Sequence, residues 1–192
     1  MDEQLREKTM RRICTGLLAH VDAGKTTLAE SLLYTGGSIR KLGRVDHKDA
    51  FLDTHELERA RGITIFSKQA EMKIEDMSIT LLDTPGHVDF SAEMERTLQV
   101  LDYAVLVISG PDGVQGHVQT LWKLLKRYEI PVFLFINKMD QPRTEKTLIL
   151  EELKKRLDER CIPFDSEKTD EWMEEIALCD EKVMEQYLET GE

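Results

Sequence analysis

The sequence predicts an α/β domain in which helices cover both faces of a mostly parallel central sheet. Apolar segments of strand length alternate with helical patterns along most of the chain. One strand-like run leads into a tight loop ending in Gly-Lys-Thr and then into a helical pattern. Two further polar motifs directly follow apolar runs, which places them at the carboxyl ends of strands, where sheets of this class bind ligands.

The expected elements follow from local periodicity and from turn residues. In chain order they are a strand at 13–18, a helix at about 26–34, strands at about 65–74 and 78–82, a helix at about 88–101, a strand at 103–109, a helix at about 115–128, a strand at 131–136, a helix at 148–157 and two short helices ending at 191. Strands 103–109 and 131–136 are continuously apolar, so both are expected to be buried on two faces. Residues 38–61 lack a regular pattern and are expected to form a long loop, which in a compact domain is typically functional or mobile.

The loop at 19–27, Ala-His-Val-Asp-Ala-Gly-Lys-Thr-Thr, predicts a phosphate-binding loop of a P-loop nucleoside triphosphatase. Its backbone N–H groups and the N-terminus of the next helix would face the phosphates. Lys25 would reach the β- and γ-phosphates, and the Thr26 hydroxyl would bind Mg²⁺. Alanine stands at 19 where the usual pattern has its first glycine, so the loop must begin with an ordinary φ. A chance Gly-Lys-Thr turn is the alternative. The expected nucleotide-contacting residues of this loop are His20, Val21, Asp22, Ala23, Gly24, Lys25, Thr26 and Thr27.

Two other motifs complete the predicted site. Asp83, in Asp-Thr-Pro-Gly, would place a carboxylate near Mg²⁺, and the N–H of Gly86 could approach the γ-phosphate; alone this pattern is common. Asn-Lys-x-Asp is more specific, because the Asp140 carboxylate can accept hydrogen bonds from N1–H and the N2 amino group of guanine, which adenine lacks. Asn137 can donate to the base, and the Lys138 stem can lie along its face. The nucleotide is therefore expected to be GTP rather than ATP.

Composition indicates an ordinary globular protein of the cytoplasm. The 192 residues carry a formal net charge of −11, and residues 151–192 account for −9 of it (6 Lys and Arg against 15 Asp and Glu). So acidic a segment argues against direct contact with a nucleic-acid phosphate backbone, and no DNA binding is expected. The N-terminus lacks a secretory signal, and no apolar run is long enough to cross a membrane. Three widely spaced cysteines indicate neither disulfides nor a zinc site.

Together these motifs resemble the GTP-binding domain of translational GTPases. Residues 19–27 are similar to the first motif of that family, 61–65 to its switch I signature and 83–87 to its switch II signature with a terminal histidine. The residues of these motifs are most similar to those of tetracycline-resistance ribosomal protection proteins, and next to those of elongation factor G. This resemblance implies that Thr64 binds Mg²⁺ and senses the γ-phosphate, and that His87 orients the attacking water.

The same resemblance implies three further roles and a domain organisation. Val21 and Ile63 would flank the histidine, and Asp22 would take part in binding a monovalent cation. The chain would comprise a leader at 1–10, the GTP-binding domain at 11–160 and the start of an inserted subdomain at 161–192. The family's fifth motif has no convincing match after Asp140, so the chain is expected to be a fragment.

The leading hypothesis is a Mg²⁺-dependent GTPase that converts GTP to GDP and phosphate and acts on the ribosome through the full-length protein. The resemblance implies that hydrolysis is slow until the ribosome engages switch II. Alternatives are a translocation GTPase like elongation factor G, a fragment that binds GTP or GDP with negligible hydrolysis, and a non-ribosomal GTPase or an ATPase. The other histidines have no partners at metal-ligand spacing and are expected to be structural or surface residues. They are His20, His47, His55 and His117.

Overall fold

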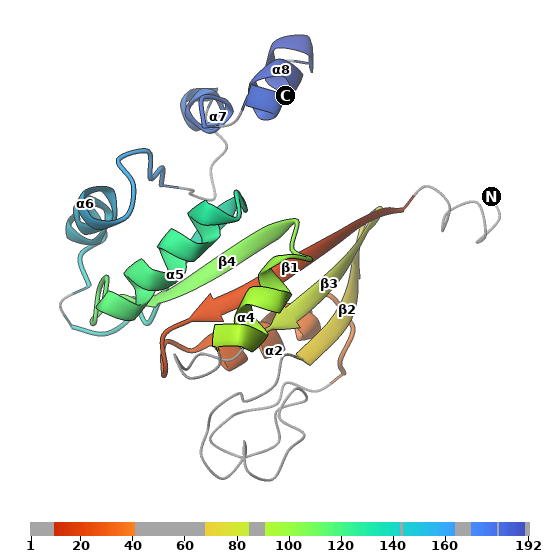
Figure 1. Cartoon of the computed structure of the whole chain (residues 1–192), viewed down its shortest axis with the longest axis horizontal. Coiled ribbons are helices and arrows are strands. Elements are labelled where there is room, and N and C mark those ends of the chain that lie inside the picture. Colours follow the sequence, from red (N-terminus) through yellow and green to blue (C-terminus); the bar gives the residue numbers. More distant parts are fainter. Residues whose placement is uncertain are drawn as a thin grey trace, which may run out of the picture. The chain divides into compact units, whose positions relative to one another are not determined.

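The computed structural model of the chain (Figure 1) divides into two compact units, Met1–Thr144 and Glu145–Glu192. The structure describes residues 10–40, 68–84, 91–142, 144–163, 170–179 and 181–190. The expected long loop, the switch I signature and most of the switch II signature lie largely or wholly outside these ranges.

The first unit contains one five-stranded sheet. Its strands are β1 (Arg11–Ala19), β2 (Lys68–Ile74), β3 (Met77–Asp83), β4 (Tyr103–Ser109) and β5 (Val132–Asn137). In space their order is β2-β3-β1-β4-β5, and every neighbouring pair is parallel except β2 with β3. The mostly parallel sheet predicted from the sequence is confirmed. β1 has neighbours from later in the chain on both sides, so the connections diverge at its carboxyl end, where ligands bind to such sheets.

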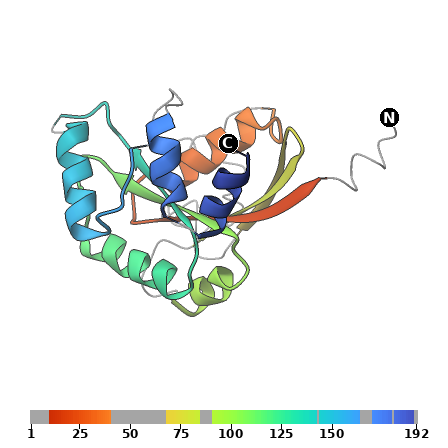
Figure 2. The same ribbon diagram turned by 90° about the horizontal axis from the view of Figure 1, so that it is seen from above.

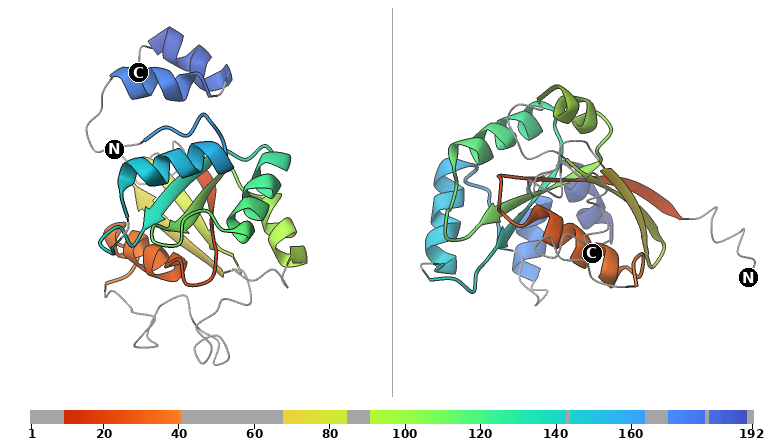
Figure 3. Two further views of the ribbon diagram at one scale, coloured as in Figure 1. Left: turned by 90° about the vertical axis from the view of Figure 1, so that its left-hand side faces the viewer. Right: turned by 90° about the horizontal axis from the view of Figure 1, so that it is seen from below.

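Three helices cover this sheet: α2 (Lys25–Thr35), α4 (Ser91–Leu98) and α5 (Gly116–Arg127). Figures 2 and 3 show α2 on one face, and α4 and α5 on the other. α2 ends at two glycines, and Gly37 adopts φ +71, a left-handed conformation that stops a helix at little steric cost.

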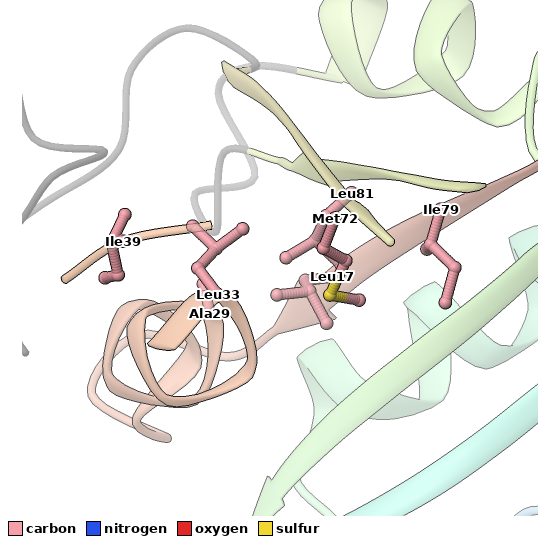
Figure 4. Packing of buried hydrophobic residues seen from close by; sticks show 7 residues of the cluster. All are labelled: Leu17, Ala29, Leu33, Ile39, Met72, Ile79 and Leu81. Carbon is pink, nitrogen blue, oxygen red and sulfur yellow. The ribbon is translucent and has the colours of Figure 1, made fainter. Parts of the chain in front are cut away.

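The core beneath α2 joins the helix to three strands (Figure 4). It comprises Leu17, Ala29, Leu33, Ile39, Met72, Ile79 and Leu81, all buried. On the opposite face, α5 turns the apolar side chains of Val118, Leu121 and Leu125 inward. Both faces of the central strands are thereby closed, which explains the continuously apolar sequence of β4.

The helix expected at about 88–101 ends earlier, at Leu98. Beyond it the chain makes a tight turn, and Leu101 packs on β1 so closely that a Cβ added to Gly16 would lie 2.4 Å from its Cδ1. Next, the N–H of Asp102 donates to the carbonyl of Cys14 (2.9 Å), and its carboxylate accepts from the N–H of Cys14 (2.7 Å). These tertiary contacts outweigh the helical pattern and end the helix early. Burial of the Cys14 thiol, which is half-buried, and the nearby Asp102 carboxylate both raise the pKa of that thiol.

The prediction that the strand at 131–136 is buried on both faces is wrong. β5 lies at the edge of the sheet within the described residues, and the side chains of its first five residues alternate between half-buried and exposed. Phe133 and Phe135 remain 53% and 41% exposed. An apolar run alone does not distinguish an edge strand from a central one, since that depends on what packs beside it.

The second unit is helical as far as it is described. Its helices are α6 (Lys146–Arg156), α7 (Asp170–Ala177) and α8 (Glu181–Thr190), and α7 packs against α8. One helix near 148–157 and two short helices before residue 191 were predicted, and these are confirmed. None of the helices in the described ranges has the length and apolar character needed to cross a membrane.

Replacing Leu33 by alanine is expected to lower the free energy of unfolding by about 2–5 kcal/mol, because its side chain is fully buried beneath β1 and β3 and alanine would leave a cavity. Tyr34→Ala, at the next position of the same helix, is a control, since Tyr34 is 51% exposed. Urea denaturation followed by circular dichroism would measure both changes. Equal losses in the two variants would contradict this description of the core.

Candidate functional site

The predicted phosphate loop joins β1 to α2 by a tight backbone turn. The N–H of Ala23 donates to the carbonyl of His20 (3.2 Å), and the N–H of Leu28 donates to the carbonyl of Gly24 (3.0 Å). Asp22 and Gly24 adopt left-handed conformations, with φ of +61 and +94. Ala19 still belongs to β1 and has no positive φ, in agreement with the ordinary conformation predicted for it.

Lys25 and Asp83 form a buried ion pair at the carboxyl end of the sheet. Lys25 begins α2 and Asp83 ends β3, and the Nζ of Lys25 donates to the Oδ1 of Asp83. Their side chains are only 9% and 0% exposed. Burying two charges is costly unless they are paired, so removing one partner would leave an uncompensated charge in the core. The pair thus fixes a cation and a carboxylate side by side next to the loop.

Thr84 fixes the direction in which the chain leaves β3. Its hydroxyl donates to the carbonyl of Leu17 (2.7 Å), and its N–H approaches the same oxygen at 3.3 Å. Because Leu17 is paired with Asp83 across the parallel ladder, these contacts hold the backbone around Asp83 in register with β1. This role of Thr84 was not predicted from the sequence, because only the carboxylate and the glycine of Asp-Thr-Pro-Gly had an expected function at a nucleotide site.

Asn137 connects the predicted base motif to the predicted phosphate loop. It ends β5, and its Nδ2 donates to the carbonyl of Ala23 at 2.9 Å. The approach is so close that a Cβ on Gly24 would lie 2.2 Å from the same nitrogen. The carbonyl of Asn137 also accepts from the N–H of Gly110 (2.8 Å), which ties it to the end of β4.

The remaining predicted residues occupy different positions relative to this centre. Lys138 follows Asn137 in a left-handed conformation (φ +59), and Asp140 is exposed beyond the strand end. Thr26 lies in the first turn of α2, next to the buried lysine, and Thr27 is exposed. Val21 is half-buried in the loop. The predicted residues Thr64, Gly86 and His87, with Ile63, lie outside the described part of the chain.

A contact that sequence reasoning missed joins two histidines. The rings of His20 and His117 lie with centroids 5.6 Å apart. Both were expected to be structural or surface residues because they have no partners at metal-ligand spacing, and His20 was also expected to contact the nucleotide from the loop. The topology brings the two histidines together, because β1 ends where α5 begins, at the same edge of the sheet.

The fold and this constellation define the chain as a P-loop nucleotide-binding domain. The family model of the elongation factor Tu GTP binding domain matches residues 9–191, and the chain belongs to this family. Membership implies guanine-nucleotide binding and confirms the resemblance to translational GTPases.

Similar curated proteins are tetracycline resistance proteins. TetO from Campylobacter jejuni is 40% identical over 191 residues, covering 93% of this chain and 30% of TetO. TetM from Ureaplasma urealyticum is 47% identical over 148 residues, covering 77% of this chain and 23% of TetM. The chain therefore spans less than a third of these relatives. A crystal structure of a protein from Thermus thermophilus shares the fold, with a TM-score of 0.76 and 24% identity over 92% of this chain and 33% of that one.

Gly24→Ala is expected to lower guanine-nucleotide affinity about tenfold or more. The new Cβ would be strained at φ +94 and would displace the Asn137 amide that holds the loop. Titration with fluorescent GDP would measure the change. Gly116→Ala is the matched control, since its added Cβ would have no atom within 4 Å among the described residues beyond its own stretch of α5, and it should change the affinity less than about twofold. Equal affinities of the two variants would contradict this account of the loop.

Proposed function

We propose that this chain binds GTP together with Mg²⁺ and hydrolyses it to GDP and phosphate. The observation that carries the proposal is the buried contact between Lys25 and Asp83 beside the loop. It places a cation that would bind phosphate next to a carboxylate that would bind the metal. Lys25 would bind the β- and γ-phosphates, assisted by loop N–H groups and the N-terminus of α2.

The oxygen donors near this pair fit magnesium. Asp83 supplies a buried carboxylate, and Thr26 supplies a hydroxyl in the first turn of α2; Mg²⁺ prefers hard oxygen ligands and keeps several waters when it also binds phosphates. Such an ion would neutralise charge on the phosphates. By its resemblance to the family, Thr64 would add a third protein ligand.

Guanine would be recognised by the residues after β5. The Asp140 carboxylate would accept hydrogen bonds from N1–H and the N2 amino group, and the Lys138 stem would cover one face of the base. Asn137 supports this role through its bond to the carbonyl of Ala23, because that bond sets the position of the base motif relative to the phosphate loop. A site built on such hydrogen bonds discriminates strongly against adenine.

Hydrolysis would depend on the switch II residues. His87 would orient the attacking water, and the N–H of Gly86 would contact the γ-phosphate, as the resemblance implies. Val21 and Ile63 would flank the histidine, and Asp22 would take part in binding a monovalent cation. Phosphoryl transfer needs positioning and charge neutralisation more than covalent chemistry, so withholding the histidine would be enough to keep the reaction slow.

We further propose that the chain acts on the ribosome as part of a longer protein of the cytoplasm, in the manner of ribosomal protection, with translocation as the alternative. The support is its similarity to tetracycline resistance proteins, of which it covers less than a third. Within the chain, residues 1–10 would be a leader, 11–160 the GTP-binding domain and 161–192 the start of an inserted subdomain.

Single-turnover hydrolysis tests the proposal. With protein in excess, release of phosphate from GTP should be measurable and should stop when EDTA removes Mg²⁺. With ribosomes present to bring the histidine into position, His87→Ala should lower the rate about 10²-fold or more, as expected for a residue that orients the attacking water, with little change in GTP affinity. His47→Ala, a histidine outside every motif, is the control. Binding of GTP without release of phosphate would make the chain a nucleotide-binding module rather than an enzyme.

A further inference from the structure

The histidine pair lies where the phosphate loop leaves the sheet. His20 is the first residue after β1, and His117 lies in the first turn of α5. Their ring centroids are 5.6 Å apart and their planes are tilted by 55°. This separation and tilt fall within the range of attractive contacts between flat rings. A residue on a core helix thus contacts the first residue of the loop.

The backbone of His20 helps to set the conformation of the loop. Its carbonyl accepts the N–H of Ala23 and closes the turn, and Asp22 within that turn adopts a left-handed φ of +61. Such a conformation costs free energy for a residue with a Cβ, less for aspartate than for most, so contacts around the turn stabilise it. Asn137 holds one side of the turn, through the carbonyl of Ala23. The other side needs its own restraint.

No hydrogen bond supplies that restraint at the buried Nδ1 of His20, which has no partner among the described residues. His117, in contrast, is carried by a well-anchored helix: the next residue, Val118, and Leu121 are each 1% exposed in the core. α5 also packs against β1 and β4. A ring on a fixed helix can therefore restrain a ring on a loop.

We propose that His117 is a positioning residue for the phosphate-binding loop and acts through ring contact with His20. The loop would then be held from two sides, by Asn137 at the end of β5 and by His117 at the start of α5. This inference rests on the proposed nucleotide binding, and the role it gives to His117 is indirect, through His20. Its effect should be on the backbone N–H groups of residues 20–24 rather than on recognition of the base.

Hydrogen exchange of the nucleotide-free chain tests the positioning directly. His117→Ala should speed exchange of the amides at 20–24 while leaving exchange in β1 and β4 unchanged. GDP affinity should fall about threefold to tenfold, the size expected for losing one ring contact, through faster dissociation. The preference for GDP over ADP should stay the same. His117→Phe keeps a flat ring at this position and should restore both exchange and affinity to within about twofold.

Lys123→Ala, at an exposed position of the same helix, is the control and should match the wild-type chain. Unaltered loop exchange in His117→Ala would overturn the inference, and so would failure of His117→Phe to restore it. Faster exchange throughout the sheet, with a lower urea midpoint, would also overturn it by showing a general structural role. If the wild-type chain bound no guanine nucleotide, the proposed function would fail, while faster loop exchange in His117→Ala would still support the positioning role.

Discussion

The buried ion pair of Lys25 and Asp83 is the interaction on which the rest of the site depends. It forms because β1 and β3 are parallel neighbours whose carboxyl ends meet at one edge, with Leu17 opposite Asp83. Neither charge could remain in the core alone. The sheet register therefore does more than hold the fold together, since it brings the helix that follows β1 to the carboxylate that ends β3. Thr84 then fixes where the chain continues.

The second constraint is the tight backbone of the loop. Gly24 is required by both its positive φ and its proximity to the Asn137 amide, so two motifs far apart in the sequence are fitted to each other. The hydrogen bond from Asn137 to the loop therefore fixes the position of the base motif relative to the phosphate motif. The ring contact of His20 with His117 adds a connection to the opposite face of the sheet. Within the described residues, the loop between β1 and α2 is thus also connected to β5 and to α5.

Much of this architecture could be predicted because the signals are local. The Gly-Lys-Thr loop and strand β4 are encoded by residues that sit next to one another, and both were placed correctly. The early end of α4 could not be predicted, because Leu101 leaves the helical pattern to pack over Gly16 of β1. The exposure of β5 and the partner of His117 depend on which elements lie side by side, which no spacing in the sequence encodes.

The most direct test of the account is the nucleotide selectivity of the chain, titrated with fluorescent GDP, ADP and xanthosine diphosphate in the presence and absence of Mg²⁺. We expect Mg²⁺ to strengthen binding of GDP, and GDP to bind several orders of magnitude more tightly than ADP. In Asp140→Asn the preference should move from guanine to xanthine, because the new amide can donate to the extra carbonyl of xanthine. Binding of ADP as tight as that of GDP, or an unchanged preference in the variant, would contradict the account.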